Sequence, residues 1–399
     1  MIGLDSDFGQ RAKIRVIGVG GCGNNSVNRM IDDKVESIDF IAANTDALVL
    51  QRSKAAVRIE LGKLLTNGLG AGGKPEVGKQ SAEEQRNDIA KHLEGADLVF
   101  VTAGMGGGTG TGAAPVIAAI SQSLGILTVG VVTKPFDFEG RVRMRNALSG
   151  IDEMKKNVDA LIVIPNQKLY TAMNKNTSMS EAFRKADDVL IQGVTGISDL
   201  ITKAGEVNRD FADVRTVLTD KGMAHMGIGY AAGDNKAEDA MKAAINSPLL
   251  ETSIQGARSV LVNFASKKGN ITLDDTNIAM NILYDMTDDE AEIFYGTSEN
   301  DDSEDGISIT LIATGFDTEF QPKQHTAAPL GTITSFEQGK RDPSIHNTQP
   351  SPYKSPQTVA PNSVEQYSTD PKTLNGDSNQ IDLPSFLLGR KKNKPDYRD

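Results

Sequence analysis

Tryptophan is absent from this 399-residue sequence, and cysteine occurs once, at Cys22. A single cysteine excludes an intrachain disulfide and makes a cysteine-based zinc site implausible. Basic residues are the minority, 42 against 53 acidic ones, and the formal net charge is −11 at pH 7. Because phosphate backbones are held by clustered Lys and Arg, this balance argues against a general binder of nucleic acid or of acidic membranes.

Long apolar segments are missing too. No uninterrupted apolar stretch approaches the roughly 20 residues that a membrane helix needs. The N-terminal sequence MIGLDSDFGQRAK contains no apolar core of a secretory signal. We therefore expect a cytoplasmic protein that reaches a membrane only through a partner.

What the sequence does contain, in its first half, is an alternation of apolar β-rich runs with stretches of helical spacing. Near-continuous apolar strands alternating with helices predict an α/β fold, with a parallel sheet covered on both faces. The expected strands are 14–17, 38–44, 96–104, 126–133 and 160–166, and the expected helices are 24–32, 81–94, 112–124 and 141–157.

A long helix is expected at 179–203. It opens with a capping-box pattern from Ser178 to Glu181, and apolar residues then recur at helical spacing. At 1.5 Å per residue it would extend about 37 Å, enough to cross one domain and reach a second. The following region, 221–316, predicts a smaller α+β domain with strands in MGIGYA, SVLVNF, EIFYGT and GISITLIATGF and helices at 236–245 and 274–285.

The composition changes after Gly315. Residues 317–380 are rich in Pro, Gln, Ser, Thr and Asn, which predicts a disordered linker. An apolar-acidic patch follows, Ile381-Asp-Leu-Pro-Ser-Phe-Leu-Leu388, and then a basic tail. An apolar cluster on a disordered tether is typical of a docking motif that orders when bound.

The first glycine motif is Gly18-Val-Gly-Gly-Cys-Gly23, placed directly after an expected strand. It matches G-x-G-x-x-G, in which glycines let the backbone approach phosphate at a helix N-terminus. An NAD-binding protein would have Asp or Glu at the end of the second strand, where this chain has Ala43-Asn-Thr-Asp46. This motif alone leaves an NAD site open.

A second motif, Gly104-Met-Gly-Gly-Gly-Thr-Gly-Thr-Gly112, also lies between an apolar strand and a helix. Two cradles of backbone N–H donors on adjacent strand ends suit a triphosphate better than a dinucleotide. A third segment, Gly68 to Lys74, matches most of a G-x-x-x-x-G-K phosphate loop, but Pro75 replaces the Ser or Thr that would hold magnesium. We interpret it as a flexible loop that closes over the nucleotide, with Lys74 screening phosphate charge.

These segments resemble the tubulin/FtsZ superfamily, and within it the bacterial FtsZ cell-division GTPases. The signature GGGTGTG is at 106–112, and the other matching motifs follow in family order over roughly residues 12–316. They are GVGGCGNN (18–25), NTD (44–46), GLGAG (68–72), PFDFEGRVR (135–143), IPN (164–166) and NRDFADV (208–214). The resemblance implies a Rossmann-like GTP-binding domain, a central helix, a smaller α+β domain and a tail. The implied segments are a flexible leader (1–11), the GTP-binding domain (12–178), the central helix (179–203), the catalytic loop and connection (204–220), the C-terminal domain (221–316), the linker (317–380) and a partner-binding peptide with a basic tail (381–399).

The resemblance also implies the nucleotide site. The first loop would line the diphosphate, the second would hold the terminal phosphates, and Mg²⁺ would be carried by the phosphates, with no metal ligand among the side chains. From the residues alone, Phe183 is predicted to be a core residue of the long helix and Asp187 a solvated charge. The implied nucleotide-binding residues are Gly20, Gly21, Cys22, Gly23, Asn24, Asn25, Asn44, Gly72, Gly104, Gly106, Gly107, Gly108, Thr109, Gly110 and Thr111, with Glu139 and Arg143 at the ribose and Asn166, Phe183 and Asp187 around the guanine.

The segment Asn208-Arg-Asp210-Phe-Ala-Asp213 contains two acids three residues apart. From the residues alone, it is interpreted as a helix cap with an exposed acidic face. The resemblance instead implies that this loop enters the nucleotide pocket of the next subunit, where Asp210 and Asp213 polarise the attacking water and Asn208 contacts phosphate or water. Phosphoryl transfer needs mainly positioning and charge stabilisation.

Three classes of function compete at this point: a GTPase that polymerises head to tail, an NAD-dependent oxidoreductase, and a tubulin-like scaffold that binds GTP without turnover. The resemblance places the first ahead, at the mid-cell division site beneath the membrane. Its implied partners are further copies of the chain and, through the C-terminal peptide, an FtsA-like membrane tether and other division proteins. The peptide residues implied are Asp382, Pro384, Phe386 and Leu387.

Overall fold

The computed structural model describes residues 12–171, 173, 176–203, 205, 207, 209–250, 254–299 and 306–316. The expected leader, linker and C-terminal peptide lie outside the described residues, with Asp382, Pro384, Phe386 and Leu387 among them. Asn208 lies outside them as well.

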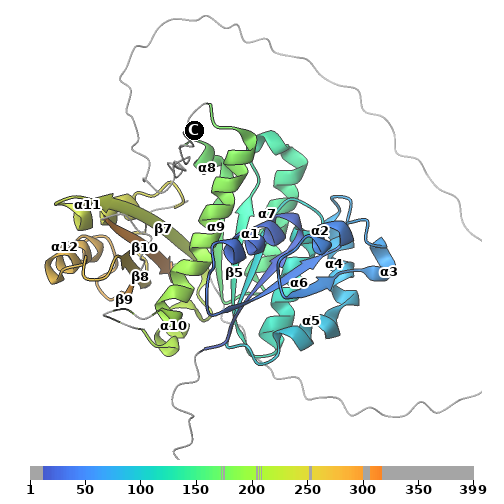
Figure 1. Cartoon of the computed structure of the whole chain (residues 1–399), viewed down its shortest axis with the longest axis horizontal. Helices are drawn as coiled ribbons and strands as arrows, with labels where there is room; N and C mark the ends of the chain where they lie inside the picture. Colours follow the sequence, from blue (N-terminus) through green and yellow to red (C-terminus); the bar gives the residue numbers. More distant parts are fainter. Residues whose placement is uncertain are drawn as a thin grey trace, which may run out of the picture. The chain divides into compact units, whose positions relative to one another are not determined.

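The described strands form one ten-stranded sheet in the order β3-β2-β1-β4-β5-β6-β7-β10-β8-β9 (Figure 1). Neighbours from β3 to β7 are parallel, β10 is antiparallel to both β7 and β8, and β9 is parallel to β8. This arrangement confirms the predicted α/β class with a parallel-dominated sheet. The strand bounds are β1 Ile14–Val19, β2 Ile38–Asn44, β3 Val57–Glu60, β4 Leu98–Gly104, β5 Leu127–Lys134, β6 Ala160–Pro165, β7 Gly222–Ala232, β8 Ser259–Ser266, β9 Glu292–Glu299 and β10 Gly306–Thr314.

Alternate residues of the parallel strands supply two separate hydrophobic cores. On β1, Ile14 and Val16 enter the core that contains apolar residues of α1, α9 and α10, while Ile17 and Val19 enter the core on the opposite face. Helices α4 to α7 supply the second core, so both faces of the parallel part are covered. The helix bounds are α1 Gly20–Asp32, α2 Ala47–Gln51, α3 Lys63–Thr66, α4 Pro75–Glu84, α5 Arg86–Leu93, α6 Thr109–Ser123, α7 Arg141–Lys155, α8 Asn166–Thr171, α9 Met179–Thr202, α10 Phe211–Leu218, α11 Lys236–Ile245 and α12 Leu273–Tyr284.

The long helix expected at 179–203 is α9. Its N-cap is Ser178, whose side chain accepts a hydrogen bond from the backbone N–H of Glu181 at 3.2 Å. Helix α9 packs on β5 and β6 of the parallel part of the sheet and also contacts β8 and β9. The helix therefore connects the parallel half to the second half of the chain (Figure 1).

Strand β7 belongs to both halves. Its first residues, Gly222 to Ala224, pair with β6, and its continuation from His225 to Ala232 pairs with β10. A third core, with α11 and α12, covers the second half.

Two predictions of helix position were wrong. The helix expected at 81–94 is broken at Gln85, and the structure has two helices there, α4 and α5. The helix expected to begin at residue 24 begins at Gly20, directly after β1.

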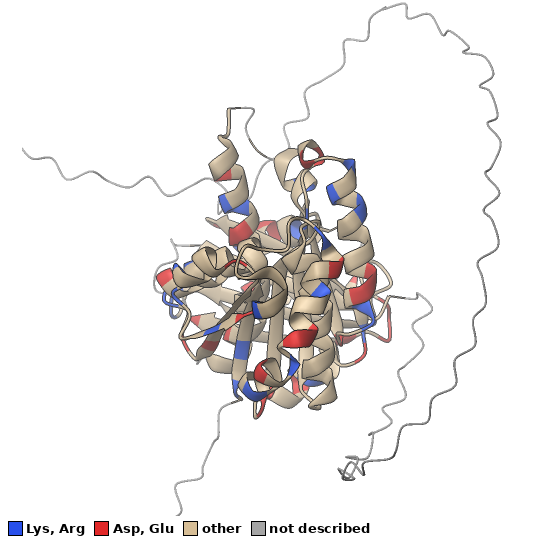
Figure 2. Cartoon of the chain, turned by 90° about the vertical axis from the view of Figure 1, so that its right-hand side faces the viewer, with Lys and Arg blue, Asp and Glu red and all other residues tan. Residues whose placement is uncertain are grey.

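No helix in the part of the chain that the structure describes is long and apolar enough to span a membrane. Figure 2 shows acidic and basic residues interspersed on the helices of the face in view.

Candidate functional site

The first glycine loop is a tight strand-to-helix turn. Gly20 opens α1 with a left-handed φ of +73°, a conformation that L-residues with a side chain rarely adopt. A Cβ at Gly23 would lie 2.4 Å from the carbonyl oxygen of Thr102 on β4. Glycine is therefore required at these positions to bring α1 down onto the ends of β1 and β4.

The second loop interlocks with the first. A Cβ at Gly104 would lie 2.7 Å from Cβ of Cys22, and one at Gly20 would lie 3.0 Å from the backbone nitrogen of Gly110. Inside the loop, the backbone N–H of Gly106 donates to Oγ1 of Thr111 at 2.8 Å. Because β1 and β4 are adjacent and parallel, the N-termini of α1 and α6 open at the same edge of the sheet.

The third loop packs on the second. A Cβ at Gly108 would lie 2.8 Å from Cβ of Ala71 and 2.9 Å from the backbone nitrogen of Lys74. Lys74 is the N-cap residue of α4, and Pro75 takes the first helical position. The segment from Gly68 to Lys74, which resembles a G-x-x-x-x-G-K phosphate loop in sequence, is therefore a loop that precedes α4 and supports the second glycine loop.

Some glycines of these loops face open space. A Cβ built on Gly21, Gly72, Gly73 or Gly107 meets no atom within 4 Å. Their neighbours in the loops are packed in backbone contact, so these positions mark the open side of the loops, which we call the cradle. The N-termini of α1 and α6 open at this edge of the sheet, which suits a polyphosphate.

Asn24 and Asn44 are buried in the support of this cradle. The Asn24 side chain donates to the carbonyl oxygen of Gly18 at 2.8 Å and accepts from Asn44 at 2.7 Å. Both side chains are engaged with the protein, whereas that of Asn25 is exposed. Asp46 caps α2 by accepting at Oδ1 from the backbone N–H groups of Leu48 and Val49.

Asp187 is largely buried against α1, with 16% of its side chain exposed. Its Oδ1 accepts from Ser26 Oγ at 3.2 Å, and its Oδ2 lies 3.6 Å from Arg29 Nη1. Burial raises the pKa of Asp187 to about 6, although Arg29 and Ser26 oppose the rise. The prediction of a solvated charge at this position was wrong, because α1 covers this turn of α9.

The Cys22 thiol lies between the two glycine loops. Its Sγ is 3.9 Å from Asp187 Oδ1. Burial, with the Asp187 carboxylate as the second cause, raises the pKa of Cys22 to about 12. At neutral pH the thiol is therefore mostly protonated.

Phe183 lies at the edge of the site and is 40% exposed, so the prediction of a core residue was wrong. Its ring stands edge-on to Phe136 and Phe138, with centroid distances of 5.4 and 6.4 Å. Nearby, Glu139 Oε1 accepts from the backbone N–H of Phe136 at 2.9 Å, and Glu139 Oε2 pairs with Arg143 Nε at 2.9 Å. The first residues of α9 thus meet the segment that follows β5.

Asn166 comes directly after β6, at the same edge of the sheet as the glycine loops. It is 5% exposed, and its Oδ1 is buried without a hydrogen-bond partner among the described residues. An orphaned buried acceptor is costly unless a ligand supplies the donor.

The acids of the 208–213 segment lie at the opposite edge. Helix α10 immediately precedes β7, whose first residue, Gly222, pairs with Ala160, the first residue of β6. The glycine loops follow the last residues of β1 and β4. Six residues of parallel strand separate the two edges, roughly 20 Å. The predicted acids and the predicted phosphate loops of one chain therefore do not meet.

Within a single chain these acids have structural partners. Asp210 is the N-cap of α10 and accepts from the backbone N–H of Asp213 at 3.0 Å. Asp213 pairs with Arg209, which also donates from Nε to the carbonyl oxygen of Tyr295 at 2.6 Å. In the isolated chain Asp210 is therefore a helix cap, as the residues alone predicted.

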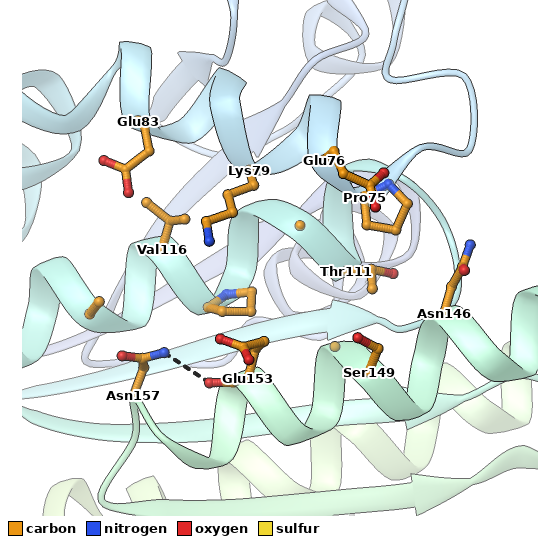
Figure 3. Close-up of a pocket in the computed structure, with 14 residues that line it drawn as sticks. Pro75, Glu76, Lys79, Glu83, Thr111, Val116, Asn146, Ser149, Glu153 and Asn157 are labelled. Carbon is orange, nitrogen blue, oxygen red and sulfur yellow. Dashed lines mark hydrogen bonds between the residues drawn. The ribbon is translucent and has the colours of Figure 1, made fainter. Parts of the chain in front are cut away.

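A cavity of about 440 Å³ lies behind the second glycine loop, between α4, α6 and α7 (Figure 3). Thr111 and Gly112 reach it from α6, and the side chains of Lys79 and Glu153 face it from the flanking helices. No group of three or more His, Cys, Asp or Glu residues placed to hold a metal occurs among the described residues.

Some residues of the site were not predicted. Thr45 contacts the second loop through its hydroxyl, and Ser26 and Arg29 contact Asp187. Ser26 lies four residues after Cys22, so the helical spacing of α1 was the available signal. For Thr45 the signal was its position beside Asn44 at the end of a strand.

Comparison with known proteins finds a family match for each half of the chain. A model of the Tubulin/FtsZ family GTPase domain matches residues 13–174, and one of the FtsZ family C-terminal domain matches residues 222–317. The chain belongs to the tubulin/FtsZ family. It is 40% identical to a solved FtsZ dimer from M. jannaschii, with a TM-score of 0.75, over 81% of this chain and 96% of that one. A second FtsZ structure from M. jannaschii, that of a point mutant, is 42% identical over 78% of this chain and 94% of that one, with a TM-score of 0.74.

CetZ1 from Haloferax volcanii shares the fold at 20% identity, with a TM-score of 0.67 over 77% of this chain and 95% of that one. Membership of the tubulin/FtsZ family makes the chain a GTPase that binds GTP. It also excludes the hypothesis that the chain is an NAD-dependent oxidoreductase, in agreement with the capping role of Asp46.

Proposed function

We propose that the chain assembles head to tail, and that GTP bound at the carboxyl edge of one copy is hydrolysed with acids from the amino edge of the next. The observation that carries this proposal is the placement of the two sets of residues on opposite edges of one sheet. A relative at 40% identity has been solved as an FtsZ dimer. An interface that joins opposite ends of identical copies does not close, and it generates a filament.

The cradle would hold the nucleotide by its phosphates. Backbone N–H groups of the first loop would take the diphosphate, and those of the second loop, with the Thr109 hydroxyl, the terminal phosphate. Guanine presents N–H donors on the edge where adenine presents an acceptor, so the Asp187 carboxylate and the orphaned Asn166 Oδ1 favour guanine. Mg²⁺ would neutralise the β- and γ-phosphates when bound, since phosphate and hydroxyl oxygens are the donors that it prefers.

Hydrolysis would need only an oriented water. Asp213 of the neighbouring copy would accept a proton from the water while the water oxygen attacks the γ-phosphorus. Asp210 and Asn208 would lie beside Asp213. The bond between the γ-phosphorus and the bridging oxygen breaks, and GDP and phosphate leave. Because Asp210 caps α10, the same carboxylate would also fix the orientation of the helix that presents Asp213.

The remaining roles are proposed from the family. We infer that the filament forms part of the bacterial division ring, in the cytoplasm at the mid-cell site beneath the membrane. The C-terminal peptide would bind an FtsA-like tether and other division proteins, so contact with the membrane would be indirect, and no nucleic acid is expected as a partner.

The test is phosphate release from GTP with magnesium over a range of protein concentrations, with filaments pelleted from the same samples. Specific activity should be near zero below a threshold concentration and rise together with sedimentation. Constant turnover per molecule down to the lowest concentration would disprove the shared site.

A matched pair of variants separates catalysis from binding. Asp213→Asn should lower turnover by at least about 100-fold with GTP affinity unchanged, since a positioned proton acceptor contributes this much or more. Asp152→Asn, an exposed acid on α7, should turn over normally. Normal turnover in Asp213→Asn would show that these acids are structural and take no part in hydrolysis.

A further inference from the structure

Helix α6 contains a proline in its first half. Pro115 has no backbone N–H, so the carbonyl of Thr111, four residues earlier, receives no helical hydrogen bond from it. Thr111 is 3% exposed, and its hydroxyl oxygen already accepts from the backbone N–H of Gly106 at 2.8 Å. A carbonyl in a buried residue is costly to leave unpaired, so this position is suited to a group that donates an N–H.

The Thr111 carbonyl lies at the cavity of about 440 Å³ between α4, α6 and α7 (Figure 3). Thr111 and Pro115 both line the cavity, and a Cβ at Gly150, which also lines it, would lie 3.4 Å from the carbonyl oxygen. Because residue 150 is glycine, no side chain is present at that position to cover this oxygen. The wall beside it is apolar, with Val116 and Ala119. A cavity of this size, with an apolar wall and an acceptor to satisfy, is typical of a small-molecule site.

The charged side chains around the cavity favour a cation over an anion. Three acids and one base line it: Glu76, Glu83, Glu153 and Lys79. Arg86 pairs with Glu83 at 2.8 Å, and Lys156 pairs with Glu153 at 2.6 Å. The Lys156 hydrogen bond and, less strongly, the charge of Lys79 lower the pKa of Glu153, so the charge of Lys79 is offset by an acid as well. Glu76 is left without an ion-pair partner among the described residues, and Figure 3 shows it toward the same end of the cavity as Thr111.

We propose that this cavity is a binding site for a small organic cation with an apolar body. An N–H group of the cation donates to the Thr111 carbonyl, and the Glu76 carboxylate balances the charge. The apolar body lies on Pro115 and Val116. The glycines that mark the open cradle are not among the residues that line this cavity, so the cation and the nucleotide bind at separate sites.

The first measurement uses benzamidine as the probe, a flat cation with N–H donors and an apolar ring. Ligand-observed NMR titrations are made with GDP saturating and with protein below the concentration at which it sediments. We expect saturable binding with a dissociation constant of about 1 mM or tighter, as is usual for a ligand of this size in an enclosed site. Loss of binding on addition of GDP would place the probe in the nucleotide site and would overturn the proposal.

Two further probes separate the two interactions. Phenyltrimethylammonium keeps the charge and the ring but has no N–H, and benzoate reverses the charge. Both should bind at least about tenfold more weakly than benzamidine, because each loses a hydrogen bond or a charge interaction at a partly buried acceptor. Equal binding of benzamidine and phenyltrimethylammonium would show that the Thr111 carbonyl is not the acceptor.

The second measurement repeats the benzamidine titration with variants. Pro115→Ala supplies the missing helical N–H to the Thr111 carbonyl, so it should weaken benzamidine at least about fivefold and leave the chain at least as stable in urea. Val116→Ala is its control, because it removes apolar surface from the same wall without adding a donor, and it should weaken benzamidine by no more than about twofold. Parent-like binding in Pro115→Ala would overturn the role of the carbonyl.

A second pair of variants tests the charge. Glu76→Gln should weaken benzamidine about threefold, the usual scale for an exposed carboxylate. Asp152→Asn, an exposed acid on α7 that does not line the cavity, should bind it as the parent does. Equal losses in the two variants would mean that Glu76 has no specific role. If benzamidine shows no saturable binding to the parent chain, water alone serves the Thr111 carbonyl and the proposal is wrong, whatever the outcome for head-to-tail assembly.

Discussion

Arg209 Nη1 and Asp213 Oδ2 lie 3.4 Å apart at the start of α10. The same guanidinium is 5.3 Å from the ring centroid of Tyr295 and donates to the carbonyl oxygen of that residue. One side chain therefore ties a proposed catalytic acid to β9, a strand more than 80 residues further along the chain.

Loss of this connection should lower stability. Arg209→Ala removes the ion pair, the hydrogen bond to Tyr295 and the stacking contact, and we expect unfolding free energy to fall by roughly 1–3 kcal/mol in urea titrations. Arg215→Ala, an exposed arginine on the same helix, should change it by less than about 0.5 kcal/mol. Similar values for the two variants would mean that the connection is not stabilising.

Two glycines of the second loop should respond in opposite ways to alanine. A Cβ on Gly107 meets open space, so Gly107→Ala should leave stability unchanged and reduce GTP affinity at least about tenfold by filling the cradle. A Cβ on Gly112 would lie 1.9 Å from the Pro75 carbonyl oxygen, so Gly112→Ala should cost about 2 kcal/mol or more of stability. Nucleotide titration and urea unfolding of both variants make the comparison. Undiminished GTP affinity in Gly107→Ala would show that the phosphates bind elsewhere.

The raised pKa of Asp187 makes stability depend on pH. The carboxyl binds its proton more tightly in the folded chain, with a pKa of about 6 against 3.8, so its contribution is present below pH 3.8 and is lost as pH rises through 6. The loss is at most roughly 3 kcal/mol. Without nucleotide, Asp187→Asn should therefore gain stability relative to the parent chain as pH rises from 3.8 to 6, and keep that gain at higher pH. A parallel pH dependence in parent and variant would contradict this assignment.

Cys22 should be a slow nucleophile. With its pKa raised to about 12, little thiolate forms near neutral pH. Alkylation by iodoacetamide at pH 8, without nucleotide, should be at least about 100-fold slower in the folded chain than in urea. Because the chain has one cysteine, the whole signal reports this residue. Comparable rates in the two states would show that the thiol is accessible and ionised.

Periodicity and glycine motifs predicted the parallel sheet and most of its helices, because strand alternation and phosphate loops are local signals. The break at Gln85 carries neither Gly nor Pro, so the sequence offered no reason to divide 81–94. The α1 start at Gly20 was missed because a glycine-rich stretch has poor helix propensity, which tertiary packing overrides here.

The site was less predictable where partners are distant in sequence. Phe183 has the spacing of a core residue, but it lies in the first turns of α9, beside Phe136 and Phe138 rather than under the sheet. Asp187 has the composition of a surface charge, and only the packing of α1 against α9 buries it. No local pattern points from Arg209 to Tyr295.

Strand β7 is shared by the parallel and antiparallel parts of the sheet, and this makes its length intolerant of change. Side chains of a strand alternate between faces, so one inserted residue reverses inside and outside for every residue beyond it. An insertion near Ala224 would move the side chains of the β10-paired residues to the opposite faces of the sheet, while the residues paired with β6 kept their faces. Core residues in the second part of β7 would then point away from their cores. Insertions in the loops on either side would be absorbed, and those in β7 would not.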